Sequence, residues 1–136
     1  MDGFDPIIGA LNTSLNLRLT NQNVAAANVA NADTPGYKAK KMDFELALRD
    51  ALAIGDRLQV EGDAVGHIVH QPTDAVEPVI YDDPNGIESL DGNTVDRAIE
   101  MSAMAENHIL YDASVEMLKK KVAMLKYAIT EGGGNR

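Results

Sequence analysis

The stretch MSAMAENHILYDASVEMLKKKVAMLKYAIT, residues 101–130, carries the most regular pattern in the chain. Large side chains recur there at alternating spacings of three and four, which is the repeat of a helix that packs along one seam. The seam consists of Met101, Met104, His108, Tyr111, Val115, Leu118, Val122, Leu125 and Ile129. A second apolar stripe lies beside it and makes the surface wider than a two-stranded coiled coil needs. We therefore predict a long helix over residues 94–130 that contacts several neighbours.

Both ends of this helix can be predicted. Asn93 or Thr94 suits the N-cap, and Asp96 would lie in the first turn, where a carboxylate favours the helix dipole. Three glycines at 132–134 end the helix. At about 1.5 Å per residue the helix would span roughly 55 Å.

A second helix is predicted over residues 6–31. Asp5 and Pro6 suit the N-cap and the first turn, and apolar residues including Leu11 and Leu15 follow at helical spacing. The other faces carry asparagine and threonine, and Arg18 is the only charged side chain between residues 6 and 32. Buried amides need hydrogen-bond partners, so we interpret this segment as a helix covered by protein on most sides. A weak, partly disordered N-terminal arm is the alternative that the sequence leaves open.

The sequence NVANADTPGYKAK, residues 28–40, indicates how the first helix ends. A residue before proline is pushed to an extended conformation, as Thr34 would be here. Pro35 and Gly36 suit the two central positions of a type II turn, where glycine accepts a positive φ. After the turn come three lysines that could meet acids of the middle segment or of a neighbouring subunit, namely Lys38, Lys40 and Lys41.

The middle segment, residues 32–93, holds most of the acidity, with 13 acidic and 5 basic residues. Apolar residues from Phe44 to Leu52 predict a short helix that stops near Gly55. The rest predicts loops and one β-hairpin, with short strands at RLQV (57–60) and EPVIY (77–81) and a turn at DDPNG (82–86). We expect a mainly α fold in three parts: an N-terminal helix (1–31), an exposed acidic middle (32–93), and a C-terminal helix with a glycine-rich tail (94–136). The two long helices should pack antiparallel.

Composition excludes several function classes. The net charge of −9 and the pI near 4.6 argue against nucleic acid as a partner. The chain has no cysteine, which rules out disulfides and thiolate chemistry. Neither a signal peptide nor a membrane span is predicted.

No catalytic, metal or cofactor site is predicted. His67 and His70 form an H-x-x-H pair in a loop-like context with no further ligands, and His108 falls in the helical seam as a packing residue. Asp82 and Asp83 belong to a turn and not to a pocket of the kind that acid–base catalysis needs. The run of lysines at 119–121 is the solvated face of the long helix. No nucleotide or nucleophile motif is present, so we expect a protein that is not an enzyme.

Two motifs together resemble a known family. NVANADTPGYKAKKMDFE (28–45) resembles the N-terminal signature of bacterial flagellar rod and hook proteins, and SLDGNTVD (89–96) before a long helix resembles the proximal rod proteins of the FlgB family. The matching residues are Asn28, Asn31, Thr34, Pro35, Gly36 and Tyr37 in the first motif, and Asp91, Gly92, Asn93, Thr94 and Asp96 in the second.

The resemblance implies a structural subunit of the flagellar basal body. Such proteins build a tube from N- and C-terminal helices and leave through the flagellar type III apparatus without a cleaved signal. Expected partners are copies of the chain, other rod proteins, and membrane-ring and export-gate proteins, without direct membrane insertion. The assembly seam would comprise Leu11, Leu15, Met104, Tyr111, Val115, Leu118, Val122, Leu125 and Ile129, with the acidic middle facing outward. The alternative is a soluble coiled-coil adaptor or dimer, which should solvate one face of its first helix with charge.

Overall fold

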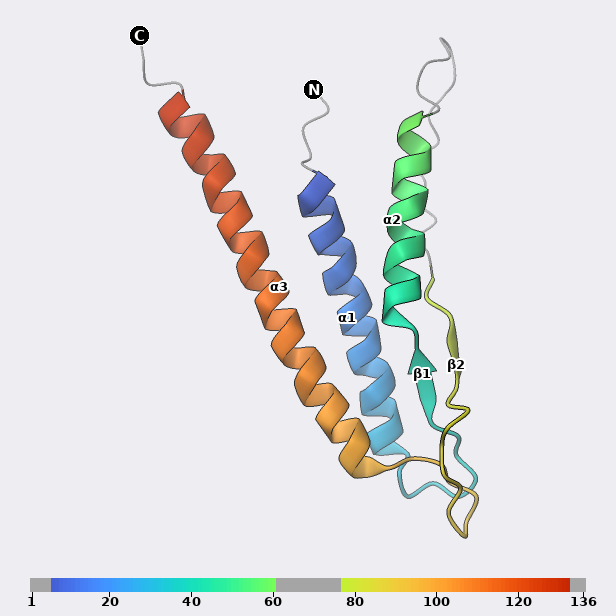
Figure 1. Ribbon diagram of the computed structural model, residues 1–136. Helices are drawn as coiled ribbons and strands as arrows, with labels where there is room; N and C mark the ends of the chain where they lie inside the picture. Colours follow the sequence, from blue (N-terminus) through green and yellow to red (C-terminus); the bar gives the residue numbers. More distant parts are fainter. Residues whose placement is uncertain (1–5, 61–76, 133–136) are drawn as a thin grey trace.

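The computed structural model describes residues 6–60 and 77–132. It contains α1 (Pro6–Ala30), β1 (Lys40–Met42), α2 (Phe44–Val60), β2 (Ile80–Asp82) and α3 (Arg97–Gly132). The three helices lie side by side with α1 in the middle, and α1 runs antiparallel to both α2 and α3 (Figure 1). The predicted mainly α fold with two antiparallel long helices is therefore confirmed. Asp5 and the glycines at 133 and 134 lie outside the described residues.

Helix α1 has a contact on each of two sides. Towards α2 and β1 it buries Leu17, which packs in a small core with Met42 and Ala47, and Phe44 and Leu48 cover this core. Towards α3 it makes its most extensive contact. These contacts cover two sides of α1, but Asn12, Asn16 and Asn23 remain exposed, so contacts within the chain account for only part of the near absence of charge in residues 6–32.

Helix α3 begins one turn later than predicted. The carboxylate of Asp96 accepts hydrogen bonds from the backbone N–H groups of Ala98 at 2.9 Å and Ile99 at 3.1 Å, so Asp96 is the N-cap. The prediction of Asn93 or Thr94 as the cap is wrong because both side chains bond to the loop after α1 instead. At 36 residues, α3 is about 54 Å long.

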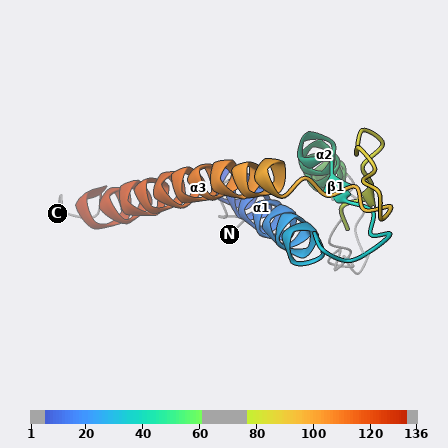
Figure 2. The ribbon, with the colours of Figure 1, turned by 90° about the horizontal axis from the view of Figure 1, so that it is seen from below.

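The two long helices converge at one end and diverge at the other. They lie together where α1 ends and α3 begins, and they separate towards the two chain termini (Figures 1 and 2). The α3 residues buried near the convergent end are polar and seven residues apart: Glu100, Asn107 and Ser114. The side of α3 that faces α1 is thus a polar heptad stripe, with seam residues such as Met104 and Tyr111 half-buried beside it.

The middle segment differs from the prediction in two respects. Helix α2 continues through Gly55 to Val60, so the predicted stop and the RLQV strand are both wrong. A glycine costs a helix only about 1 kcal/mol, and good helix formers follow it here. The hairpin predicted within residues 56–90 is also wrong. Strand β2 pairs antiparallel with β1, which precedes α2 in the sequence, and Lys41 lies opposite Tyr81.

The DDPNG turn is present as predicted. The Gly86 N–H donates to the Asp83 carbonyl at 3.3 Å, and the Asn85 N–H donates to the Asp83 carboxylate at 3.0 Å. Strand β2 covers only the end of the predicted EPVIY strand.

Candidate functional site: a hydrogen-bonded clasp and an exposed helix

The two motifs singled out in the sequence lie against each other at the convergent end of the helices. We call this region the clasp and define it as residues 28–42 together with 80–96. The Tyr37 N–H donates to the Thr34 carbonyl at 3.2 Å, and Gly36 has φ +72°, as the predicted type II turn requires. The turn directs the chain from the end of α1 into β1.

Asn28 is the centre of the clasp and is fully buried, with 0% of its surface exposed. Its amide nitrogen donates to the Lys40 carbonyl at 2.8 Å and to the Glu100 carboxylate at 3.0 Å. Its amide oxygen accepts from the Lys40 N–H at 2.9 Å and from the Tyr37 hydroxyl at 3.3 Å. One side chain therefore joins α1, β1 and α3, and only a primary amide supplies two donors and an acceptor in this arrangement.

Asn93 joins the loop that precedes α3 to the turn after α1, and only 3% of the surface of Asn93 is exposed. Its amide nitrogen lies within hydrogen-bond distance of three carbonyls at the end of α1, those of Asn31 (2.9 Å), Ala32 (3.1 Å) and Thr34 (2.8 Å). Its amide oxygen accepts from the Val95 N–H at 2.7 Å. Asn93 thus gives a donor to carbonyls of the turn that follows the last residue of α1, Ala30.

Backbone bonds and glycines complete the clasp. The Gly36 N–H donates to the Asp91 carbonyl at 2.9 Å, and the Ala39 N–H donates to the Thr94 hydroxyl at 2.9 Å. Gly92 adopts φ +81°, and a Cβ on Gly86 would lie 2.8 Å from Cβ of Thr94. Within residues 80–96, the close approach of the turn at Gly86 to Thr94 therefore requires a glycine at position 86.

The three lysines after the turn pair with acids of the middle segment of the same chain, one of the two partners that the sequence allowed. Lys38 pairs with Glu88 at 3.1 Å and Lys41 with Asp83 at 2.7 Å, while Lys40 pairs with Asp82 across the strands. The hydrogen bond from Lys41 lowers the pKa of Asp83 and, reciprocally, the bond to Asp83 raises the pKa of Lys41. The exposed pairs contribute little stability each, so the buried amides hold the clasp together.

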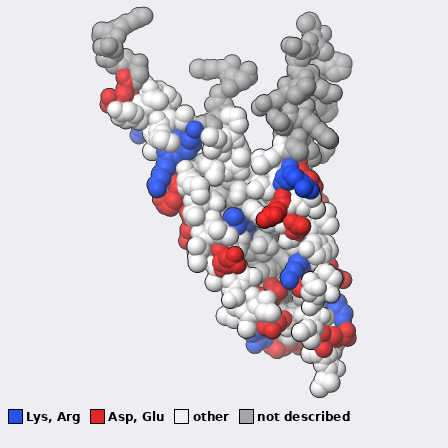
Figure 3. Space-filling model, in the orientation of Figure 1, with Lys and Arg blue, Asp and Glu red and all other residues white. Residues whose placement is uncertain are grey.

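The C-terminal half of α3 has the opposite character. Of the nine residues predicted for the assembly seam, six are half-buried within the chain: Leu11, Leu15, Met104, Tyr111, Val115 and Leu118. The other three are exposed, with Val122 50% and Ile129 78% exposed, together with Leu125. Met117, Met124 and Tyr127 are exposed as well. In Figure 3, charged groups gather around the clasp and along the outer edge of α3, and uncharged residues cover most of the face over α1.

Other sequence candidates fall in different places. His108, expected as a packing residue, is 68% exposed and lies 3.1 Å from Asp112, so that expectation is wrong for the single chain. His67 and His70 lie outside the described residues. Within residues 6–60 and 77–132, no acidic or histidine side chains are grouped as metal ligands would be, and no helix is long and apolar enough to cross a bilayer.

Sequence reasoning missed the polar stripe of Glu100, Asn107 and Ser114 and the tight glycine at 86. The stripe does leave a signal, because its members are seven residues apart and adjoin the apolar seam. A polar heptad position is easily overlooked when only large residues are counted.

Comparison with known proteins gives a consistent result. A family model described as "Flagella basal body rod protein" matches residues 10–38. The chain is 34% identical over 140 residues to the flagellar basal body rod protein FlgB of Escherichia coli, covering 97% of this chain and 99% of that protein. It is 36% identical over 129 residues to FlgB of Cereibacter sphaeroides, covering 95% and 98%, and 34% identical over 143 residues to FlgB of Salmonella typhimurium, covering 99% of each.

Proposed function

This chain belongs to the FlgB family of flagellar basal body rod proteins, and from that premise we propose that it assembles with copies of itself into the helical wall of the proximal rod. It is a structural protein of the flagellar basal body and not an enzyme. The proposal concerns how the subunit builds the rod and which surface it uses.

The observation that carries the proposal is the exposure of the C-terminal half of α3. Val122 and Ile129 are 50% and 78% exposed, although their spacing is that of a packed seam. An exposed apolar surface of this kind marks a site of protein contact. Neighbouring subunits in a tube wall would bury it, together with the outer faces of Leu11, Leu15 and Leu118.

The clasp supports the proposal that one end of the subunit holds the fold together while the exposed half of α3 makes the contacts of assembly. Its hydrogen bonds join the end of α1 to the start of α3 and hold β1 beside β2, so the two wall helices leave from one folded end. The acidic middle would then lie outside the wall. We propose that the rod links the membrane ring and the export gate to the distal rod, and that the subunit reaches it through the type III apparatus.

Leu118→Asp tests the proposal. Leu118 is half-buried in the single chain, and a carboxylate there would be desolvated without a partner in a closed interface, which costs several kcal/mol. In cells that lack their own copy, the variant should be made and exported but absent from purified basal bodies, and the cells should not swim.

Lys120→Asp is the matched control, since Lys120 is exposed two residues away, and it should assemble and support swimming. If both variants behave alike, α3 uses another face. If the isolated chain sediments as a stable, fully helical dimer, the adaptor function is favoured instead.

A further inference from the structure

One stripe of α1 is open to solvent and carries no charge. Apart from Pro6 and Ile7 in the first turn, all exposed residues of α1 lie within about 100° of the helix surface and recur at spacings of three and four. We call them the α1 stripe: Gly9, Asn12, Asn16, Leu19, Asn23, Ala26, Ala27 and Ala30. A helix face that stays in water normally carries charged side chains, so the α1 stripe has the composition of a face that other protein covers.

Helix α3 carries an exposed stripe of its own, separate from the assembly seam. Its members follow a heptad spacing along almost the whole helix. We call them the α3 outer stripe: Ile99, Ala103, Glu106, Leu110, Ala113, Met117, Met124 and Ala128. The four large apolar residues among them are between 41% and 61% exposed. By the same helical count, Asp112, Glu116 and Lys119 lie on a different face of α3, so the outer stripe is not the charged solvent face of the helix.

The α3 outer stripe is hollowed near the start of the helix. An open hollow of about 580 Å³ is lined there by Ala98, Ile99, Ser102, Ala103 and Glu106. These residues form two neighbouring rows with a spacing of four, 98–102–106 and 99–103, and such rows leave a groove that accepts a ridge of another helix. Three of the five are alanine or serine, so the backbone of a second helix can approach closely.

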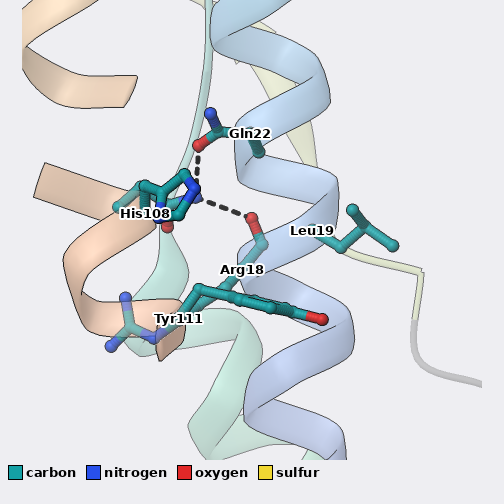
Figure 4. A pocket seen from close by; sticks show the side chains of 6 residues that line it. Arg18, Leu19, Gln22, His108 and Tyr111 are labelled. Carbon is teal, nitrogen blue, oxygen red and sulfur yellow. Dashed lines mark hydrogen bonds between the residues drawn. The ribbon is translucent and has the colours of Figure 1, made fainter. Parts of the chain in front are cut away.

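Within the subunit, α1 contacts a different side of α3. Asn107 is buried on that side, and its amide nitrogen donates to the Arg18 carbonyl at 2.9 Å and to Gln22 Oε1 at 2.8 Å (Figure 4). Counted at 3.6 residues per turn around these antiparallel helices, the α1 stripe and the α3 outer stripe lie on opposite sides of the α1–α3 pair. The α1 helix of the same chain therefore cannot cover the α3 outer stripe.

The α1 stripe of another copy has the composition to cover it. Helix α2 exposes Glu45, Arg49 and Asp50 and would bring charges onto a largely apolar surface. The α1 stripe brings no charge, and its asparagines can donate to the carboxylate of Glu106, which forms no ion pair with a described residue. The lengths also agree, since the α1 stripe covers about 33 Å and the α3 outer stripe about 45 Å.

We propose that the α1 stripe of one copy of this chain packs against the α3 outer stripe of a second copy. The inference rests on the proposed wall assembly and names the two surfaces that meet in it. Each copy has one stripe of each kind on opposite sides, so a pair of copies still has one free stripe of each kind and the contact repeats. A self-complementary contact would instead close at two copies.

Disulfide trapping tests this contact, since the natural chain has no cysteine. One tagged copy carries a cysteine in the α1 stripe, and a second copy with a different tag carries one in the α3 outer stripe. The substitutions are Asn12→Cys, Asn16→Cys or Asn23→Cys in the first copy, and Glu106→Cys, Leu110→Cys, Ala113→Cys or Met117→Cys in the second. A disulfide needs Cα atoms within about 7 Å. Oxidation of purified basal bodies should trap a mixed pair for at least one combination, and Asp112→Cys on the charged face should give none.

Charges placed on either stripe test its burial. Asn16→Asp keeps the size of the side chain, and Met117→Lys changes the other surface. Both positions are exposed in the single chain, so urea denaturation of the purified variants should match that of the original chain. Their amounts in basal bodies should fall about tenfold or more, because a charge in the contact loses its hydration. Ala105→Lys is the matched control for Met117→Lys, since Ala105 is exposed on the charged face of α3, and it should incorporate normally.

The outcomes separate this inference from the proposed function. If the unaltered chain is missing from basal bodies, the proposed wall assembly fails. If the chain is present but no combination is trapped above the Asp112→Cys control, the pairing of the two stripes is wrong and the wall assembly stands. Normal incorporation of both Asn16→Asp and Met117→Lys, or equal losses for Met117→Lys and Ala105→Lys, would overturn the pairing as well.

Discussion

The two ends of the α1–α3 pair reverse the usual distribution of polar and apolar residues. At the clasp, Asn28 and Asn93 are buried, with 0% and 3% of their surfaces exposed. At the diverging end, Val122 and Ile129 are 50% and 78% exposed. The clasp satisfies its polar groups within the chain, and the diverging end leaves its apolar groups to be covered by other protein.

This difference separates what folds the subunit from what assembles it. Buried amides with complete sets of hydrogen bonds fix one geometry, since a partly satisfied buried network is costly. Exposed apolar residues in a long helix add little to a single chain, because a helix gains most of its stability from packing. Substitutions at the clasp should therefore act on folding, and substitutions at the diverging end should act on assembly alone.

The largest effect is expected from Asn28→Leu. This change keeps the approximate size of the side chain but leaves the backbone groups of Lys40 and the carboxylate of Glu100 without their partner. The free energy of unfolding of the purified chain should fall by about 3–5 kcal/mol in urea denaturation.

Asn23→Leu is the matched control, because it makes the same change on the same helix at an exposed position. It should shift the free energy of unfolding by no more than about 0.5 kcal/mol. Equal effects of the two substitutions would show that Asn28 contributes by helix propensity and not through the clasp.

Val122→Asp should abolish assembly without changing the fold. Val122 is half exposed, so the unfolding free energy of the single chain should stay within about 0.5 kcal/mol of the original. Basal bodies should nevertheless lack the variant, because a carboxylate in a closed wall loses its hydration. A variant that unfolds readily would indicate that α3 is packed here before assembly, and the contrast between the two ends would break down.

Gly86→Ala should have an intermediate effect on folding. The added Cβ would lie 2.8 Å from Cβ of Thr94, whose hydroxyl accepts the Ala39 N–H bond. The expected loss is about 1–3 kcal/mol in unfolding free energy, as for other overpacked sites.

Gly9→Ala is the counterpart near the diverging end, where a new Cβ meets nothing within 4 Å. It should stabilise the helix by about 0.5–1 kcal/mol. If Gly86→Ala also stabilised the chain, Gly86 and Thr94 would not lie as close together as described.

The smallest effect concerns pH. Folding lowers the pKa of Asp83 chiefly through the hydrogen bond from Lys41, so this carboxylate stabilises the fold above its usual pKa of 3.8 and loses that contribution as pH falls through the lowered value. Asp83→Asn should therefore flatten the acid side of the stability curve below about pH 4. The measurement is urea denaturation between pH 2 and pH 7.

Much of the fold was predictable because local rules suffice for it. The spacing of large residues predicted α3, the Asp-Pro start and the helical spacing of apolar residues predicted α1, and the Thr-Pro-Gly-Tyr sequence predicted the turn. Each depends on residues within one or two helical turns of each other. The end of α2 was missed because a single glycine is a weak stop signal, and the strand pairing was missed because β1 and β2 are about forty residues apart in the register Lys41–Tyr81.

The sequence by itself determined the helices, the turn and the family, since periodicity, proline–glycine chemistry and two motifs are read along the chain. Only the tertiary structure decided what the motif residues do. Asn28 and Asn93 could have faced a partner, but the fold directs their amides to carbonyls and carboxylates of their own chain. It likewise decided that a polar stripe of α3 faces α1. The physical reason is that a hydrogen bond between residues 28 and 100 depends on how two helices are brought together, and local sequence preferences do not encode that distance.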